Sequence, residues 1–170
     1  MGGFAVSVRA EPRTTRDVDF AVAVKDDREA EEFAFQLSTR GYIVGTSVEQ
    51  TGTGRLATIR TTAPSGTLVD LLFASSGIEA EIAAAATPVD FLGGLPIPVA
   101  ATGHLIVCKL LARDDRSRPQ DRVDLRALFV VASPADLALA RTALELVSSR
   151  GYARGKDLAR SLEEALAELG

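Results

Sequence analysis

Two aspartates, Asp17 and Asp19, lie two residues apart at the start of the valine-rich segment 17–24. The valine content and partial alternation of this segment predict a β-strand. Side chains at positions i and i+2 of a strand project from the same face, so both carboxylates converge on one point. Two such charges repel each other unless a cation lies between them, and Mg²⁺ accepts carboxylate and phosphate oxygens together. The spacing therefore favours a magnesium site; two exposed acids at a strand entrance are the alternative.

Asp70 is the only charged residue in the apolar segment 67–73, which also predicts a strand. A carboxylate in this setting is costly unless it pairs with a cation or binds a metal. Together with Asp17 and Asp19 it would complete a three-carboxylate site that holds one or two metal ions and activates an attacking hydroxyl group. An ion pair between Asp70 and one of the arginines is the alternative.

Glycines and cations near the aspartate pair predict phosphate binding. Gly2 and Gly3 precede a predicted helix at residues 4–10, and glycines let a phosphate approach the backbone and the free N–H groups of a helix N-terminus. A Gly-Gly pair alone is a weak indication. Positive charge for a triphosphate would come from the residues directly before the aspartate pair. These residues are Arg13, Thr14 and Arg16.

Lys109 interrupts the segment 105–112, which is apolar on all sides and predicts a buried helix. A lysine in such a helix either extends to solvent or contacts an anion. Arg113 and Arg116 follow four and seven positions later, so we expect them on the same side of a helix that runs to residue 114. This face would contact the phosphates of a nucleotide.

The remaining polar candidates are ambiguous or weak. Asp121 and Asp124, three apart on a predicted helix at 119–132, either orient these cations or are solvated. His104, the only histidine, is not expected to be catalytic. Cys108 is more typical of a small core residue than of a nucleophile, and a single cysteine excludes a disulfide framework and a cysteine-rich zinc site.

The elements that must position these residues fall into two halves. Up to residue 100 the expected helices are 4–10 and 27–39, and the expected strands are 17–24, 42–48, 55–61 and 67–73. Residues 78–86 allow helix or strand, and a loop or edge strand leads to Val99. Later helices are expected at 103–114, 119–132, 134–149 and 156–169, with Thr102 and Ser133 as N-caps. The pattern predicts an α/β (α+β) fold: a mixed sheet flanked by helices over residues 1–100, with a helical bundle at 101–170 packed on it.

Composition limits the functional classes. The 170 residues are 46% hydrophobic with a net charge of −4, which argues against a broad nucleic-acid-coating surface but not against local arginine clusters. No apolar run approaches the roughly 18–20 residues that span a bilayer. There is no signal peptide and no disulfide framework, so we expect a cytoplasmic protein with no membrane contact.

The ordered motifs resemble the DNA-polymerase-β-like nucleotidyltransferase superfamily. They are Gly2-Gly-Phe-Ala-Val, Pro12-Arg-Thr-Thr-Arg-Asp-Val-Asp19 and the isolated Asp70. The segments 105–113 and 118–125 further resemble the AbiEii/MenT-type nucleotidyltransferase toxins of bacterial toxin–antitoxin and phage-defence systems. The resemblance extends over residues 2–128.

This resemblance implies a nucleoside triphosphate substrate, Mg²⁺ or alternatively Mn²⁺ as cofactor, and transfer of a nucleoside monophosphate to an acceptor. In the better-understood toxins of this type the acceptor is the 3′ end of tRNA, and a cognate antitoxin is an expected partner. A protein or small-molecule acceptor, or a non-catalytic binding relative, are the alternatives.

The resemblance also implies roles for individual residues. By position these are Gly2 and Gly3 for phosphate contact, Asp17 and Asp19 for metal binding, Asp70 for the third carboxylate, Lys109 for the downstream lysine, and Asp121 or Asp124 for the acid after it. Relatives carry a helix and a strand before the glycine pair, whereas this chain starts on the pair. We therefore expect a sheet without that strand and a loosely held phosphate loop.

Overall fold

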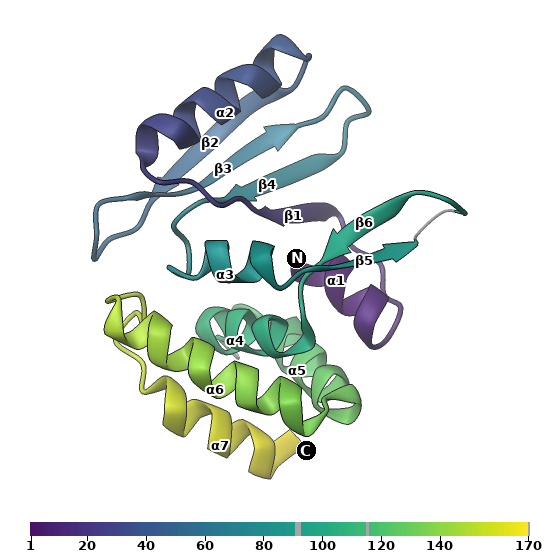
Figure 1. Ribbon diagram of the computed structural model, residues 1–170, viewed down its shortest axis with the longest axis vertical. Helices are drawn as coiled ribbons and strands as arrows, with labels where there is room; N and C mark the ends of the chain where they lie inside the picture. The colour runs from purple at the N-terminus through teal and green to yellow at the C-terminus, as the bar shows by residue number, and fades with distance from the viewer. Residues whose placement is uncertain (91–92, 115, 170) are drawn as a thin grey trace.

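A four-stranded sheet in the order β1-β4-β3-β2 forms one half of the molecule (Figure 1). Its strands are β1 (Asp17–Ala21), β2 (Ile43–Glu49), β3 (Leu56–Thr62) and β4 (Leu68–Leu72). β1 runs parallel to β4, while β3 is antiparallel to both β4 and β2, so the predicted mixed sheet is confirmed. β1 is shorter than predicted and ends at Ala21. The structure is a computed structural model that describes residues 1–90, 93–114 and 116–169.

Helix α2 (Asp27–Thr39) covers one face of the sheet (Figure 1). It begins where sequence predicts, because the Asp26 carboxylate accepts a hydrogen bond from the Glu29 N–H at 3.0 Å. Ala30 and Ala34 of α2 are buried against apolar residues on one face of the sheet. These sheet residues are Ile59, Val69, Leu71 and Phe73. Strand alternation then directs Asp70 to the opposite face.

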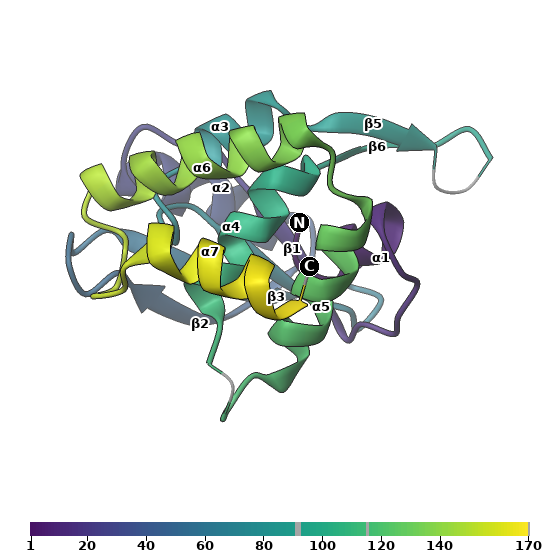
Figure 2. The same cartoon turned by 90° about the horizontal axis from the view of Figure 1, so that it is seen from below.

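The opposite face of the sheet meets α1 (Gly2–Arg9) and α3 (Glu79–Ala84), which lie between the sheet and the helical half. Of the two conformations that sequence allowed for 78–86, the structure shows a helix. A hairpin of β5 (Thr87–Asp90) and β6 (Pro96–Val99) projects beside α1 (Figure 2). Sequence anticipated an edge strand only near Val99 and missed β5.

The C-terminal half consists of helices. They are α4 (Thr102–Ala112), α5 (Pro119–Val131), α6 (Pro134–Ser149) and α7 (Leu158–Leu169). Ser133 caps α6 through a capping box with Asp136, as predicted. The prediction of Thr102 as N-cap is wrong, since the helix already begins at Thr102 and Ala101 is the extended residue before it.

The main hydrophobic core joins the two halves. Ala5 and Val6 of α1 and Ile78 before α3 are buried with apolar residues of all four C-terminal helices, including Leu105, Leu128, Leu144 and Leu162. This packing holds α4 next to α1 and hence beside β1. The division into domains at residue 100 stays a prediction. Within the described residues, no helix is long and apolar enough to cross a membrane.

Candidate active site

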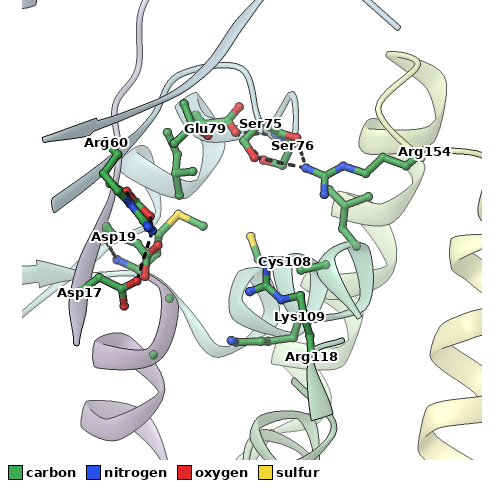
Figure 3. Close-up of a pocket in the computed structure, with 18 of the residues that line it drawn as sticks. Asp17, Asp19, Arg60, Ser75, Ser76, Glu79, Cys108, Lys109, Arg118 and Arg154 are labelled. Carbon is green, nitrogen blue, oxygen red and sulfur yellow. Dashed lines mark hydrogen bonds and ion pairs between the residues drawn. The ribbon is translucent and has the colours of Figure 1, made fainter. Parts of the chain in front are cut away.

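The two aspartates of β1 meet the aspartate of β4 on one face of the sheet. In the parallel pairing of β1 and β4, Asp19 lies opposite Asp70, and Asp17 lies opposite Leu68. All three carboxylates line one cavity of about 450 Å³ (Figure 3). The prediction that Asp17 and Asp19 share a face is confirmed. The sequence separation of 51 residues between Asp19 and Asp70 is closed by the parallel strand pairing.

Asp70 has an arginine partner that sequence did not identify. Arg60 of β3 lies opposite Asp70 in the antiparallel register. Its Nε donates to Oδ1 of Asp70 at 2.7 Å and its Nη2 to Oδ2 at 2.5 Å, while Nη2 lies 3.5 Å from Oδ2 of Asp17. Such a bidentate pair is among the stronger ionic contacts in proteins. The structure therefore shows the ion-pair alternative for Asp70: a guanidinium takes the place beside it that the three-carboxylate hypothesis gave to a metal ion.

Asp19 is the carboxylate with the greatest need for a cation. Its side chain accepts no hydrogen bond and forms no ion pair within the described part of the chain. Burial and the neighbouring charges of Asp17 and Asp70 raise the pKa of Asp19, against smaller opposing effects of the N-terminal amine and Lys109. An unpaired, partly buried carboxylate beside a second one is a suitable donor pair for Mg²⁺ or Mn²⁺, which would take its other oxygens from a phosphate.

The set of carboxylates available to a metal ion is smaller than the predicted set of three. Among the described residues, no group of three or more Asp, Glu, His or Cys side chains is arranged to hold a metal ion. The Arg60 guanidinium contacts both oxygens of Asp70. The residues present therefore fit a cation held by Asp17 and Asp19 together with substrate oxygens.

Gly2 and Gly3 pack directly against the part of the cavity that carries Asp19. Gly2 begins α1 with a φ of +59°, and a Cβ atom built on it would lie 1.7 Å from Oδ2 of Asp19. A Cβ on Gly3 would lie 2.2 Å from Nη2 of Arg13. The amino group of Met1 donates to the backbone oxygen of Asp19. Contacts of the pair itself thus seat it beside Asp19, and the expectation that it is loosely held stays a prediction.

Lys109 lies on the helical side of the cavity and is almost fully buried. Its Nζ is 2.8 Å from Oδ1 of Asp121 and 2.8 Å from Oδ2 of Asp124, both on α5. Of the readings left open for Lys109, the structure shows contact with anions, and those anions belong to the protein. It also shows that Asp121 and Asp124 are both partners of the lysine and not solvated acids.

Two arginines complete this buried charge network. Arg13 places Nε 3.0 Å from Oδ1 of Asp124 and donates through Nη2 to Oδ2 at 3.1 Å. Arg118 donates through Nε to Oδ2 of Asp121 at 2.8 Å. Both arginines line the cavity. Three cations thus share two buried carboxylates, so this side of the cavity keeps an excess of positive charge.

The third side of the cavity comes from the segment before α3 and from the turn between α6 and α7. Glu79 is buried and accepts from the N–H of Ser76 at 2.6 Å and from its hydroxyl at 2.8 Å. Arg154 donates through Nη2 to the backbone oxygen of Ser75 at 2.9 Å. Figure 3 shows Arg154 reaching toward the cavity from the side opposite Asp17 and Asp19.

Five predicted nucleotide-binding residues do not line this cavity. Two of them, Asp121 and Asp124, contact lining cations but are not lining residues themselves. Thr14 and Arg16 are exposed outside it. The prediction that Arg113 extends the face of Lys109 is wrong, because α4 ends at Ala112 and the backbone turns at Arg113. Arg113 instead forms an ion pair with Glu168 of α7 at 3.2 Å.

Sequence also missed lining residues. Neither Arg60 nor Arg154 belongs to a recognisable motif. The only signal for Arg60 was that its predicted strand precedes the strand that carries Asp70. Cys108 and His104 were not expected to be catalytic, and the structure gives no reason to change that expectation. Burial raises the pKa of the Cys108 thiol to about 12 and lowers the pKa of His104, which does not line the cavity.

This geometry places carboxylates suited to a metal opposite cations suited to phosphates, with two glycines beside them. A comparison with protein families matches residues 1–169 to the family described as nucleotidyl transferase AbiEii toxin of type IV toxin–antitoxin systems. No curated protein matches the chain. A family match over nearly the whole length, together with the resemblance of its motifs, indicates a nucleotidyltransferase toxin of a toxin–antitoxin system. The chain belongs to the AbiEii nucleotidyltransferase toxin family.

Proposed function

We propose that this protein transfers a nucleoside monophosphate from a nucleoside triphosphate to the 3′ end of tRNA, with Mg²⁺ or Mn²⁺ held by Asp17 and Asp19. One observation carries the proposal. The cavity sets the unpaired carboxylate of Asp19 opposite a cluster of cations that includes Lys109. A metal–triphosphate needs both: acids for the metal and cations for the phosphates.

The metal, when bound to Asp17 and Asp19, supplies a Lewis acid that offsets phosphate charge and favours deprotonation of the attacking hydroxyl. Asp70 lies beside Asp19 and is oriented by Arg60. In this proposal Asp70 accepts the proton of the acceptor hydroxyl. Asp70 would serve as a third metal ligand only after Arg60 released one of its oxygens.

The bond changes are those of phosphoryl transfer. The acceptor oxygen bonds to the α-phosphorus, the bond from that phosphorus to the bridging oxygen breaks, and pyrophosphate leaves. Lys109 has three N–H donors and two carboxylate partners, which leaves one donor for a phosphate oxygen. Gly2 and Gly3 line the cavity at the start of α1, and the N-terminus of a helix favours phosphate oxygens. Charge that develops on the leaving group is thus met by Lys109 and the start of α1.

The acceptor is assigned from the activity of better-understood toxins of this type. A cluster of exposed cations supports it: Arg116, Arg118 and Arg122 surround the start of α5, and Arg118 also lines the cavity. Exposed arginines of this kind neutralise RNA phosphates. A cognate antitoxin is the further partner that we propose.

Labelled transfer tests this proposal. The protein is incubated with each labelled nucleoside triphosphate, Mg²⁺, and one of three acceptors: tRNA, a total protein fraction or an aminoglycoside. We expect label on tRNA, loss of label after periodate blocking of its 3′ end, and none with Asp19→Asn. Asp27→Asn is the matched control, since Asp27 is a partly exposed acid paired with Arg55 away from the cavity.

The outcomes test the identity of the acceptor separately from the transfer reaction itself. Label only on protein or on the aminoglycoside would refute the tRNA assignment and keep the transferase. No label on any acceptor, with wild-type protein and either metal, would refute nucleotide transfer altogether.

A further inference from the structure

The cations that line the cavity differ in one respect. Four of them contact carboxylates of the protein: Arg13, Arg60, Lys109 and Arg118. Arg154 does not. Its Nη2 donates to the backbone oxygen of Ser75 at 2.9 Å and approaches the Ser75 hydroxyl at 3.3 Å. Within residues 1–90, 93–114 and 116–169, it is the lining arginine or lysine side chain without a carboxylate partner.

The backbone at Arg154 has an unusual conformation. Its φ is +55°, and no other non-glycine residue among those described has a positive φ. A left-handed conformation is disfavoured for residues with a Cβ, so the surroundings must hold it. Lys156, two residues later, donates to the backbone oxygens of Leu111 and Arg113 at 2.8 Å each. This anchor on the end of α4, with the contact to Ser75, fixes the turn that presents Arg154 to the cavity.

Arg154 adds positive charge where positive charge is already in excess. Desolvation is the main cause that lowers the pKa of Arg154; Cys108 and Glu79 oppose this shift, and Arg118 adds to it. Arginine remains protonated despite such shifts. Two guanidinium groups near one another repel in the free protein, and Glu79 offsets this effect on Arg154 only in part. An anion between them and the opposite wall would relieve this cost.

We propose that Arg154 is a substrate-binding residue for the β- and γ-phosphates of the nucleoside triphosphate. The inference rests on the proposed function. Arg154 lines the same cavity as Asp17 and Asp19 but on the opposite side, so it suits the end of the triphosphate that leaves (Figure 3). Its planar guanidinium matches phosphate oxygens, and Ser75 occupies only one of its nitrogens.

A triphosphate is favoured over an RNA backbone as the anion. The cavity measures about 450 Å³ and is lined by both carboxylates and cations. A triphosphate concentrates several negative charges in such a volume, whereas a nucleic-acid strand spreads single charges along an extended surface. Arg154 therefore belongs with the nucleotide and not with the acceptor.

Three substitutions at one position test this inference in the full-length protein. Arg154→Ala removes the guanidinium but keeps the disfavoured φ, Arg154→Gly removes it and relieves the φ, and Arg154→Lys keeps a charge without the planar fork. Binding of a nucleoside triphosphate and of the monophosphate is measured calorimetrically with Mg²⁺, and the KM for tRNA in the transfer assay. Arg160→Ala is the control, since Arg160 is exposed on α7 and pairs with Glu164.

We expect Arg154→Ala and Arg154→Gly to weaken triphosphate binding by about tenfold or more, the scale of one charged contact. Arg154→Lys recovers part of the loss, the monophosphate is affected much less, and the KM for tRNA stays unchanged. Agreement between the alanine and glycine variants excludes an effect of folding, because they differ in backbone strain.

Wild-type triphosphate affinity in both Arg154→Ala and Arg154→Gly would overturn the inference. So would a change confined to the KM for tRNA, which would assign Arg154 to the acceptor. If the wild-type protein itself bound no triphosphate, the proposed function would fail and this inference with it. Wild-type binding with unaffected variants would overturn the inference alone.

Discussion

Arg60 and Asp70 face each other across β3 and β4, and the guanidinium contacts both oxygens of the carboxylate, at 2.7 Å and 2.5 Å. The same Arg60 nitrogen that reaches Asp70 lies 3.5 Å from Asp17. A cation of the protein thus stands between two acids that the sequence suggested as partners of a metal. The pair decides how many carboxylates are open to an added cation, because Asp70 contributes an oxygen only when Arg60 yields.

Arg60→Gln is expected to strengthen binding of Mn²⁺ alone by about tenfold, because it frees a third carboxylate and metal affinity rises with ligand charge. Titration of Mn²⁺ by electron paramagnetic resonance in the absence of nucleotide measures this. Asp70 is left nearly buried without its partner, so the free energy of unfolding falls by about 1–3 kcal/mol. The double variant Arg60→Gln/Asp70→Asn should lose the gain in affinity and recover part of the stability.

Arg55→Gln is the matched control, since Arg55 pairs with Asp27 at 2.7 Å just before β3. It should leave Mn²⁺ affinity unchanged. Equal or weaker Mn²⁺ binding by Arg60→Gln would mean that Arg60 does not restrain Asp70.

Gly2→Ala is expected to displace the Asp19 carboxylate, because the added Cβ would lie 1.7 Å from Oδ2. Nucleotide transfer should fall by at least about 100-fold, the scale for misplaced catalytic groups. Gly54→Ala is the control: its φ of +66° carries a similar backbone cost, but nothing lies within 4 Å of the added Cβ. Transfer rates and melting temperatures of both variants separate the two effects. Equal loss of activity in both would leave no special role for the contact with Asp19.

Asp19→Asn is expected to abolish transfer yet stabilise the metal-free protein at neutral pH. Burial and Asp17 raise the pKa of Asp19 above its ordinary value of 3.8, so the folded state holds the proton more tightly than the unfolded state. This carboxylate therefore costs stability as pH rises above 3.8, and the cost is fully present once pH exceeds the raised pKa. Urea unfolding between pH 3.5 and pH 7 with a chelator measures the difference between wild type and variant, which should vanish near the acidic end.

Asp27→Asn provides a control of opposite sign. The hydrogen bond from Arg55 lowers the pKa of Asp27, so its carboxylate stabilises the folded state at neutral pH and this variant should be less stable there. If the Asp19→Asn variant were less stable than wild type at pH 7, the Asp19 carboxylate would not destabilise the folded protein as we expect.

Lys109→Met is expected to lower the free energy of unfolding by about 3–5 kcal/mol, because it leaves two buried carboxylates without their central cation. Asp121 and Asp124 are 2% and 1% exposed, so both charges are buried in the folded protein. Urea unfolding at pH 7 measures the loss, and Lys109→Met/Asp121→Asn should recover part of it. A change below about 1 kcal/mol would show that the network does not depend on Lys109.

The sequence by itself determined the features that follow from local geometry. Strand alternation placed Asp17 and Asp19 on one face and turned Asp70 away from α2, because successive side chains of a strand alternate. Capping residues set the starts of α2 and α6, because Asp26 and Ser133 satisfy N–H groups only a few residues away. The order of the motifs along the chain was sufficient to predict the family.

Only the tertiary structure decided the partners of these residues. Asp70 meets Arg60 through the register of β3 and β4, and Lys109 meets both acids of α5 through the packing of two helices. Arg154 reaches a serine that is 79 residues away in the chain. Periodicity fixes the direction of a side chain along its own element. Which side chain stands opposite depends on strand register and on packing between distant segments, and a local pattern of residues carries neither.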